Sequence, residues 1–161
     1  MERGGKEMGL ARWFYRGGRP NWVARVLDRG GAMVCALGVA PDYMVTLEVP
    51  GRRTGRVVRL PLVMVVRDGK RYLVSMLGED VNWVRNVKAA GGRVTLLHGR
   101  TEDVRLEEVA PEQRAPVIRD YLRRAPRAGA HVPVEKDAPL AEFERVAAQF
   151  PVFRVEPGRA A

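Results

Sequence analysis

The chain has 161 residues, of which 46% are hydrophobic, and this predicts a single globular domain rather than a disordered chain. It contains no run of eighteen apolar residues and no signal-like apolar segment at its start, so we expect a cytoplasmic protein without a membrane-spanning helix. One cysteine and two histidines exclude an internal disulfide and predict no metal site.

The formal net charge of +9 favours anionic partners such as nucleic acid, an acidic lipid surface or a phosphate-bearing ligand. Only four of the 28 basic residues are lysine, a bias typical of a GC-rich genome, so charge alone does not identify the partner. Nucleic-acid binding needs basic residues interleaved with exposed aromatic residues. The predicted strands contain few of these, so we expect no nucleic-acid partner.

Residues 1–40 are predicted to form an N-terminal helical segment, broken by the glycine-rich stretches "GGRPN" and "RGG". Aromatic residues alternate there with arginines, as in "ARWFYRGGR". Two placements fit this pattern: peripheral contact with an anionic membrane at its inner face, or packing onto the rest of the protein.

Residues 41–161 are predicted to form the second part, which is rich in strands. β-Branched runs predict strands over residues 43–49, 56–66, 71–77, 93–99, 101–109 and 152–156. Asp68-Gly69 predicts a tight hairpin turn. Helices are predicted over residues 82–92, 111–124 and 139–149. Mostly sequential strands with few helices predict an α+β fold, a small antiparallel β-barrel with flanking helices, and no Rossmann sheet.

The stretch "VPGRRTGRVVRLPLV", residues 49–63, combines a basic turn with an apolar strand. Glycines can turn backbone N–H groups toward an anion, and arginine forks bind phosphate or carboxylate. Pro61 cannot donate to a ladder, so we expect the sheet to open there. The residues alone leave two interpretations open: a solvated hairpin tip, or a grip for a ligand with a flat ring and an anionic tail.

"LEVPGRRTGRVVRLPLV" and the later "DGKRYLVSMLGEDVNWVRNVKAAG" resemble the deazaflavin (coenzyme F-420)-dependent nitroreductase and quinone reductase family. The shared motifs are a G-R-[KR]-[ST]-G turn, a strand with a P-L element, a glycine-bearing loop and a W-x-x-N helix. The likeness covers roughly residues 45–155. It implies a split β-barrel of the FMN-binding type and hydride transfer from reduced F-420.

The resemblance also implies roles for residues of this chain. The phosphate and polyglutamate tail of the cofactor would lie against Arg52, Arg53, Thr54 and Gly55, with Arg59 nearby. The deazaflavin ring would lie along Pro61 and Leu62 and be approached by the backbone of Met76, Leu77 and Gly78. Trp83 and Asn86 would wall the cofactor, and Arg85 would reach its acidic tail.

The acceptor that the resemblance implies is apolar: a quinone, a nitro compound or an unsaturated lipid. Leu60 and Val63 replace the asparagine and the aromatic residue of the better-known nitroreductases, and the pattern is closer to a branch associated with fatty acids. No catalytic residue is identified. His131 is the candidate proton donor by its ordinary pKa, with water as the alternative.

Two other functions compete with this interpretation. The same barrel and turn would suit FMN, and a non-enzymatic fatty-acid-binding protein would use Arg52 or Arg53 for the carboxylate. An open sheet edge also allows a homodimer.

Overall fold

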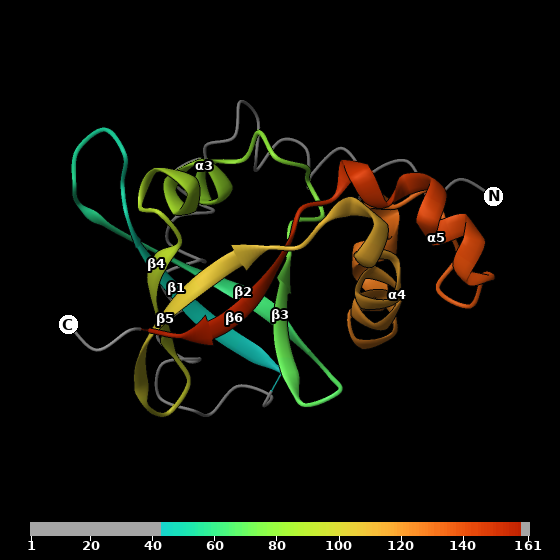
Figure 1. Cartoon of the computed structure of the whole chain (residues 1–161), viewed down its shortest axis with the longest axis horizontal. Helices are drawn as coiled ribbons and strands as arrows, with labels where there is room; N and C mark the ends of the chain where they lie inside the picture. Colours follow the sequence, from blue (N-terminus) through green and yellow to red (C-terminus); the bar gives the residue numbers. More distant parts are fainter. Residues whose placement is uncertain (1–42, 159–161) are drawn as a thin grey trace, which may run out of the picture.

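The computed structural model describes residues 43–158, excluding the side chains of residues 126–128. Six antiparallel strands close into a barrel in the order β1-β2-β3-β6-β5-β4 (Figure 1). The strands are β1 (Met44–Pro50), β2 (Val57–Arg67), β3 (Lys70–Val74), β4 (Arg93–Leu97), β5 (Thr101–Glu108) and β6 (Val152–Pro157). The predicted α+β barrel is confirmed, while the prediction for residues 1–40 lies outside the described residues.

Within residues 43–158, three α-helices and three 3-10 helices accompany the barrel. They are α3 (Asn82–Ala89), η2 (Pro111–Gln113), α4 (Ala115–Arg124), η3 (Pro126–His131), α5 (Leu140–Val146) and η4 (Ala147–Gln149). Within the described part of the chain, no helix is long and apolar enough to cross a membrane.

Alternation of side chains along the strands fills the barrel. Val104 and Leu106 of β5 are buried, while Asp103 and Arg105 are exposed, which is the period of two that a strand with one covered face requires. Val45, Leu47 and Val49 of β1 contribute to the same core. The barrel interior is therefore packed with side chains.

Strand β1 closes the barrel because it pairs along both edges. It runs antiparallel to β2 from Met44 to Pro50, and on its other side Thr46, Leu47 and Glu48 pair with β4. The next connection, between β2 and β3, is the predicted tight hairpin. Asp68 and Gly69 both have positive φ, 51° and 73°, as a turn of type I′ requires.

Helix α3 covers one mouth of the barrel. Its buried residues Trp83, Val84 and Val87 join the barrel core, and the Trp83 ring lies 5.6 Å from that of Phe153. The helix ends at two glycines with positive φ, and a Cβ on Gly92 would lie 2.4 Å from the Leu106 carbonyl oxygen. Only glycine fits this close approach between helix end and strand.

An ion pair lies on the interior side of the barrel away from α3. Arg71 lies two residues before Leu73 on β3, and Glu102 lies two residues before Val104 on β5. Because Leu73 and Val104 point into the barrel, Arg71 and Glu102 lie on the same inner faces of their strands. The Arg71 guanidinium donates two hydrogen bonds to the Glu102 carboxylate, at 2.8 and 2.7 Å. This contact lowers the pKa of Glu102 from its ordinary value.

Glu102→Gln should therefore destabilise the fold in a pH-dependent way. A carboxylate with a lowered folded pKa stabilises above its unfolded value, about 4.3, and loses this contribution as pH falls through the lower folded value. We expect a loss of about 1 kcal/mol at pH 7 that shrinks below about pH 4. Thermal unfolding at both pH values measures it. Glu112→Gln serves as control, because Glu112 is an exposed acid without an ion pair within residues 43–158. A stability difference between Glu102→Gln and the wild-type chain that persists at low pH would contradict the prediction.

A second core lies between the outer face of the barrel and the C-terminal helices (Figure 1). Ile118 and Leu122 of α4 and Phe143 of α5 are almost fully buried against Val65 and Val152. Apolar residues at helical spacing on α4 predict this face correctly.

Buried Arg114 ties this helical layer to the barrel. Its guanidinium donates to the carbonyl oxygens of Val109, Ala148 and Phe150 and pairs with Glu108 at 3.1 Å. Four acceptors from two segments, residues 108–109 and 148–150, satisfy the buried cation.

Candidate functional site

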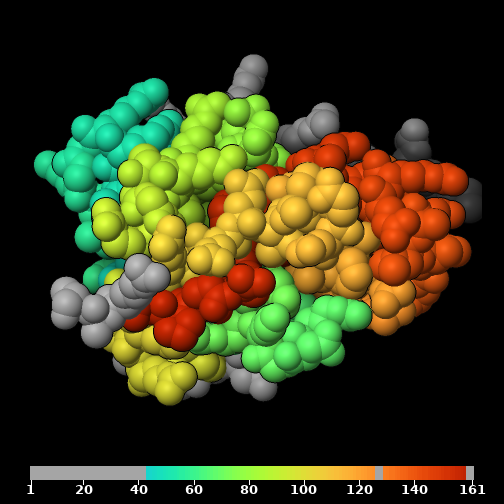
Figure 2. All heavy atoms as spheres, in the orientation of Figure 1, coloured from blue at the N-terminus to red at the C-terminus, as the bar shows by residue number. Residues whose placement is uncertain are grey.

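The basic turn, residues 51–56, connects β1 to β2 at the end of a long hairpin. Figure 1 shows this hairpin projecting beyond the barrel on the side away from α4 and α5, and Figure 2 shows its tip standing out from the surface. Residues 52–59 are all exposed. The turn thus combines high positive charge with free access from solvent.

Hydrogen bonds inside the basic turn fix its shape. The N–H of Gly51 donates to the Arg56 carbonyl and that of Gly55 to the Gly51 carbonyl, both at 2.8 Å. Thr54 Oγ1 accepts the Arg56 N–H at 3.3 Å. Gly55 has φ +70°, as the sequence suggests. Three of the six backbone N–H groups of the turn thus bond within it, and the positive charge of the turn resides in its arginine side chains.

Arg52 joins the basic turn to helix α3. Its backbone N–H and its Nη1 both donate to Asn86 Oδ1, at 3.2 and 3.0 Å. Its Nη1 and Nη2 also approach Asn82 Oδ1 at 3.3 and 3.4 Å. We call these contacts the amide clamp. It holds the start of the turn against a helix that the barrel core anchors.

The basic turn keeps its positive charge uncompensated. Within residues 43–158, Arg52, Arg53 and Arg56 form no ion pair with a carboxylate. Arg59 and Arg85, also predicted to bind the cofactor, do form such pairs. Arg59 contacts Glu48 across the hairpin, and Arg85 contacts Asp80 at 2.8 Å. Of these five arginines, the three in the turn are therefore more available to an anion than Arg59 and Arg85.

The edge of β2 beside the basic turn is open. Residues 57–63 pair with β1, whereas β3 pairs only with residues 64–67, and no other described strand lies along the first half of β2. The N–H of Met64 donates to the Tyr43 carbonyl, so in the antiparallel pattern the groups of alternate residues 57, 59, 61 and 63 face away from β1. The edge therefore offers unpaired N–H and C=O groups.

Pro61 faces this open edge, which explains why a proline is tolerated inside the strand. The β1–β2 ladder continues across the Thr46–Pro61 pair. The prediction that Pro61 interrupts the strand is therefore wrong for the β1 side. The opening arises because β3 is shorter than β2.

Side chains of β2 divide between two faces beside the open edge. Leu60 and Leu62 point toward the barrel core, where they are half-buried, and Val58 on the same face is 39% exposed near the tip. Pro61 lies on the opposite face from Leu62. A ligand that contacts both must therefore approach along the strand edge.

The segment after β3 differs from the predicted strand over residues 71–77. Pairing with β6 ends at Val74, because the chain turns at Ser75, whose hydroxyl donates to the Gly78 carbonyl at 2.6 Å. Gly78 has φ +87°. Met76 is buried in the second core rather than beside Leu62, while Leu77 is 43% exposed. The structure thus places Leu77 and Gly78, not the Met76 side chain, on an accessible turn.

Trp83 is a core residue that positions α3. It is 9% exposed and packs on Phe153, so its main effect on the site is to fix the helix carrying Asn86 and Arg85.

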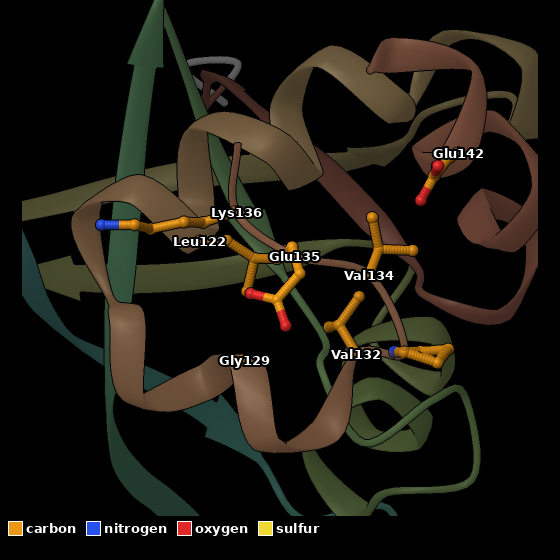
Figure 3. A pocket seen from close by; sticks show the side chains of 8 residues that line it. Leu122, Gly129, Val132, Val134, Glu135, Lys136 and Glu142 are labelled. Carbon is orange, nitrogen blue, oxygen red and sulfur yellow. The ribbon is translucent and has the colours of Figure 1, made fainter. Parts of the chain in front are cut away.

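His131 lies in η3, within the helical layer and away from the basic turn. Beside it is a hollow of about 550 Å3 between α4, the loop after η3 and α5 (Figure 3). Glu135 and Glu142 line it together with Val132 and Val134, and in Figure 3 the Lys136 side chain extends away from the others. Its carboxylates do not suit an acidic ligand. The structure does not bring His131 to the turn.

Tyr121 of α4 belongs to the same helical layer. Burial raises the pKa of its phenol to about 12, so this group stays protonated at neutral pH.

Two residues of the site escape sequence reasoning. Asn82 supports Arg52 and Glu48 neutralises Arg59, and neither stands out in the sequence. The signal for Asn82 is its spacing of four from Asn86, which places both amides on one face of α3.

Asn86→Ala should loosen the basic turn, because Asn86 Oδ1 accepts both the backbone and a side-chain donor of Arg52. We expect the free energy of unfolding to fall by about 1–3 kcal/mol and hydrogen exchange to accelerate at the Arg52 amide. Chemical denaturation and exchange mass spectrometry measure these effects. Gln113→Ala, at an exposed amide on η2, is the control, and equal effects of the two changes would contradict the role of Asn86.

The family model described as F420H(2)-dependent quinone reductase matches residues 21–136. A solved F420-H2 dependent reductase is 24% identical, with 71% of this chain and 95% of that chain covered and a TM-score of 0.50. A structure described as a domain-swapped dimer is 24% identical over 83% and 93% of the two chains, with a TM-score of 0.53.

A conserved hypothetical protein of Mycobacterium tuberculosis is 16% identical over 77% and 78% of the two chains, with a TM-score of 0.54. These three structures share the fold. No curated protein matches the chain.

Proposed function

Because the chain belongs to the F420H(2)-dependent quinone reductase family, it is an F-420-dependent oxidoreductase, and we propose that it reduces a quinone at the open edge of β2. The observation that supports this placement is the juxtaposition of three uncompensated arginines with an unpaired, apolar strand edge. Nitro compounds and unsaturated lipids are the other acceptor classes that the same apolar site would take.

The residues of the basic turn fit the anionic end of the cofactor. Phosphate and glutamate carboxylates are acceptors that guanidinium groups bind as charge-assisted forks. Arg52 would be held in place by the amide clamp, and Arg53 and Arg56 would add two mobile cations. Arg59 and Arg85 would contribute less, since each already pairs with a carboxylate.

The open edge of β2 fits the ring end. Unpaired backbone groups at residues 57, 59 and 63 can hydrogen-bond the heteroatoms of a flat ring, and Pro61 adds an apolar contact without a competing donor. Val58, Leu60 and Leu62 would shield one side of this edge from water. Leu77 and Gly78 would approach from the turn after β3.

Reduced F-420 supplies a hydride when bound, and one proton completes the reduction of a quinone to a hydroquinone. The chain would bind and orient the reactants. Among residues 57–63, the one titratable side chain is Arg59, which is paired with Glu48, and His131 lies away from this edge, so we propose solvent as the proton source.

Loss of two free cations from the basic turn should weaken cofactor binding in a salt-dependent way. We expect the double change Arg53→Ala and Arg56→Ala to weaken F-420 binding and to lower the slope of log Kd against log salt by about two. Fluorescence titration with F-420 measures both. Oxidation of reduced F-420 with naphthoquinone, a nitroarene or an unsaturated fatty acid then ranks the acceptors.

The matched control is Arg123→Ala with Arg124→Ala in the last turn of α4, where two exposed arginines lack ion pairs within the described residues. It removes the same charge and should leave the slope unchanged. Equal slopes for both double variants, or retention of FMN with no F-420 binding, would contradict the proposed site.

We also propose a homodimer. Exposed Val57 and Val58 give the open half of β2 an apolar edge, and one structural neighbour is described as a domain-swapped dimer. Light scattering after size exclusion should give twice the 18.0 kDa chain mass, and a monomer at all concentrations would refute it.

A further inference from the structure

We propose that Asn82 and Asn86 are positioning residues that hold Arg52 without neutralising it, so that its full charge remains available to an anion. Asn86 Oδ1 accepts the Arg52 N–H and Nη1, and Asn82 Oδ1 lies 3.3 and 3.4 Å from the two terminal nitrogens. Amide oxygens accept these hydrogen bonds but carry no net charge.

Helix stability alone favours an acid at position 82. Asn82 opens the first turn of α3, which contains no acidic residue and has no side-chain cap at Val81. An aspartate there would interact favourably with the helix dipole and would form an ion pair with Arg52. The amide therefore occupies a position where a carboxylate would stabilise the folded chain more.

Asn86 is a second amide at a position where another residue would stabilise helix α3 more. It is 4% exposed, and asparagine is a poor helix former whose amide competes with the backbone. Its retention in the middle of an eight-residue helix is explained by the two hydrogen bonds from Arg52.

Two neighbouring arginines are paired with acids. Glu48 pairs with Arg59 on the same hairpin, and Asp80 pairs with Arg85 of the same helix. The contact with Arg52 differs from both because its two partners are neutral. The result is a cation whose orientation is fixed while its charge is not neutralised. The guanidinium groups of Arg53 and Arg56, by contrast, have no hydrogen-bond or ion-pair partner within residues 43–158.

This inference rests on the proposed function only for the identity of the anion, the acidic tail of F-420. It predicts opposite effects of one substitution on stability and on binding. Asn82→Asp keeps the acceptor oxygen Oδ1, replaces the amide NH2 group with a second oxygen and adds a negative charge beside Arg52. If Asn82 had a purely structural role, Asn82→Asp would leave both the melting temperature and anion binding unchanged or improved.

The test compares Asn82→Asp with the wild-type chain in thermal unfolding and in F-420 fluorescence titration at several salt concentrations. We expect Asn82→Asp to melt at or above the wild-type temperature. We expect its F-420 affinity to fall about tenfold at low salt, the effect of one charge-assisted hydrogen bond. The slope of log Kd against log salt should fall by about one.

Two variants control for the loss of the contact and for the added charge. Asn82→Ala removes the acceptor but no charge, so affinity should fall while the slope stays at the wild-type value. Gln113→Glu makes the same amide-to-carboxylate change on η2. It should leave the F-420 affinity and the salt slope unchanged, because salt screens an exposed charge that is far from the turn. Wild-type binding by Asn82→Asp, equal weakening by Gln113→Glu, or failure of Asn82→Asp to fold would overturn the inference.

A second probe separates this inference from the proposed function. Inorganic tripolyphosphate should raise the melting temperature of the wild-type chain more than that of Asn82→Asp. If F-420 does not bind but this difference is observed, the proposed cofactor placement fails and the positioning role stands. If tripolyphosphate stabilises both chains equally, or neither, the positioning role fails.

Discussion

The difference in length between β2 and β3 is the constraint on which the candidate site depends. The barrel is closed by β1, which pairs along both edges, so the sheet needs no further partner for the first half of β2. That half extends past β3 as one side of a hairpin and keeps its outer groups unpaired by any described strand. Exposed backbone donors and acceptors beside apolar side chains are unusual within a closed barrel, and here they lie next to the most basic turn.

Electrostatic organisation, rather than net charge, distinguishes this end of the molecule. Two less exposed arginines elsewhere are held by acids: Arg71 by Glu102 in the barrel, and Arg114 by Glu108 under the helical layer. At the basic turn the partners of Arg52 are neutral amides. The accessible basic turn therefore carries a cation that is held in place by hydrogen bonds but is not paired with an acid within the described residues.

Local patterns in the sequence predict much of the fold because short-range physics determines them. β-Branched runs identify the strands, and Asp68-Gly69 identifies a turn that needs two positive φ values. Pro61 misleads because only alternate residues of an antiparallel strand donate to a given neighbour. The turn at Ser75 and the amide clamp depend on tertiary partners: Arg52 and Asn86 meet only because the barrel carries α3 to the hairpin.

The strand order contains two kinds of pairing: between strands that are close in sequence and between strands that are far apart in sequence. The β1–β2, β2–β3 and β4–β5 ladders join neighbours in sequence, whereas β1–β4 and β3–β6 join strands far apart along the chain. Closing such long loops carries a large entropic penalty, which slows folding. We expect the arm that bears the basic turn to assemble as a local hairpin early, and the ring of strands to be completed only when β6, the last to leave the ribosome, arrives.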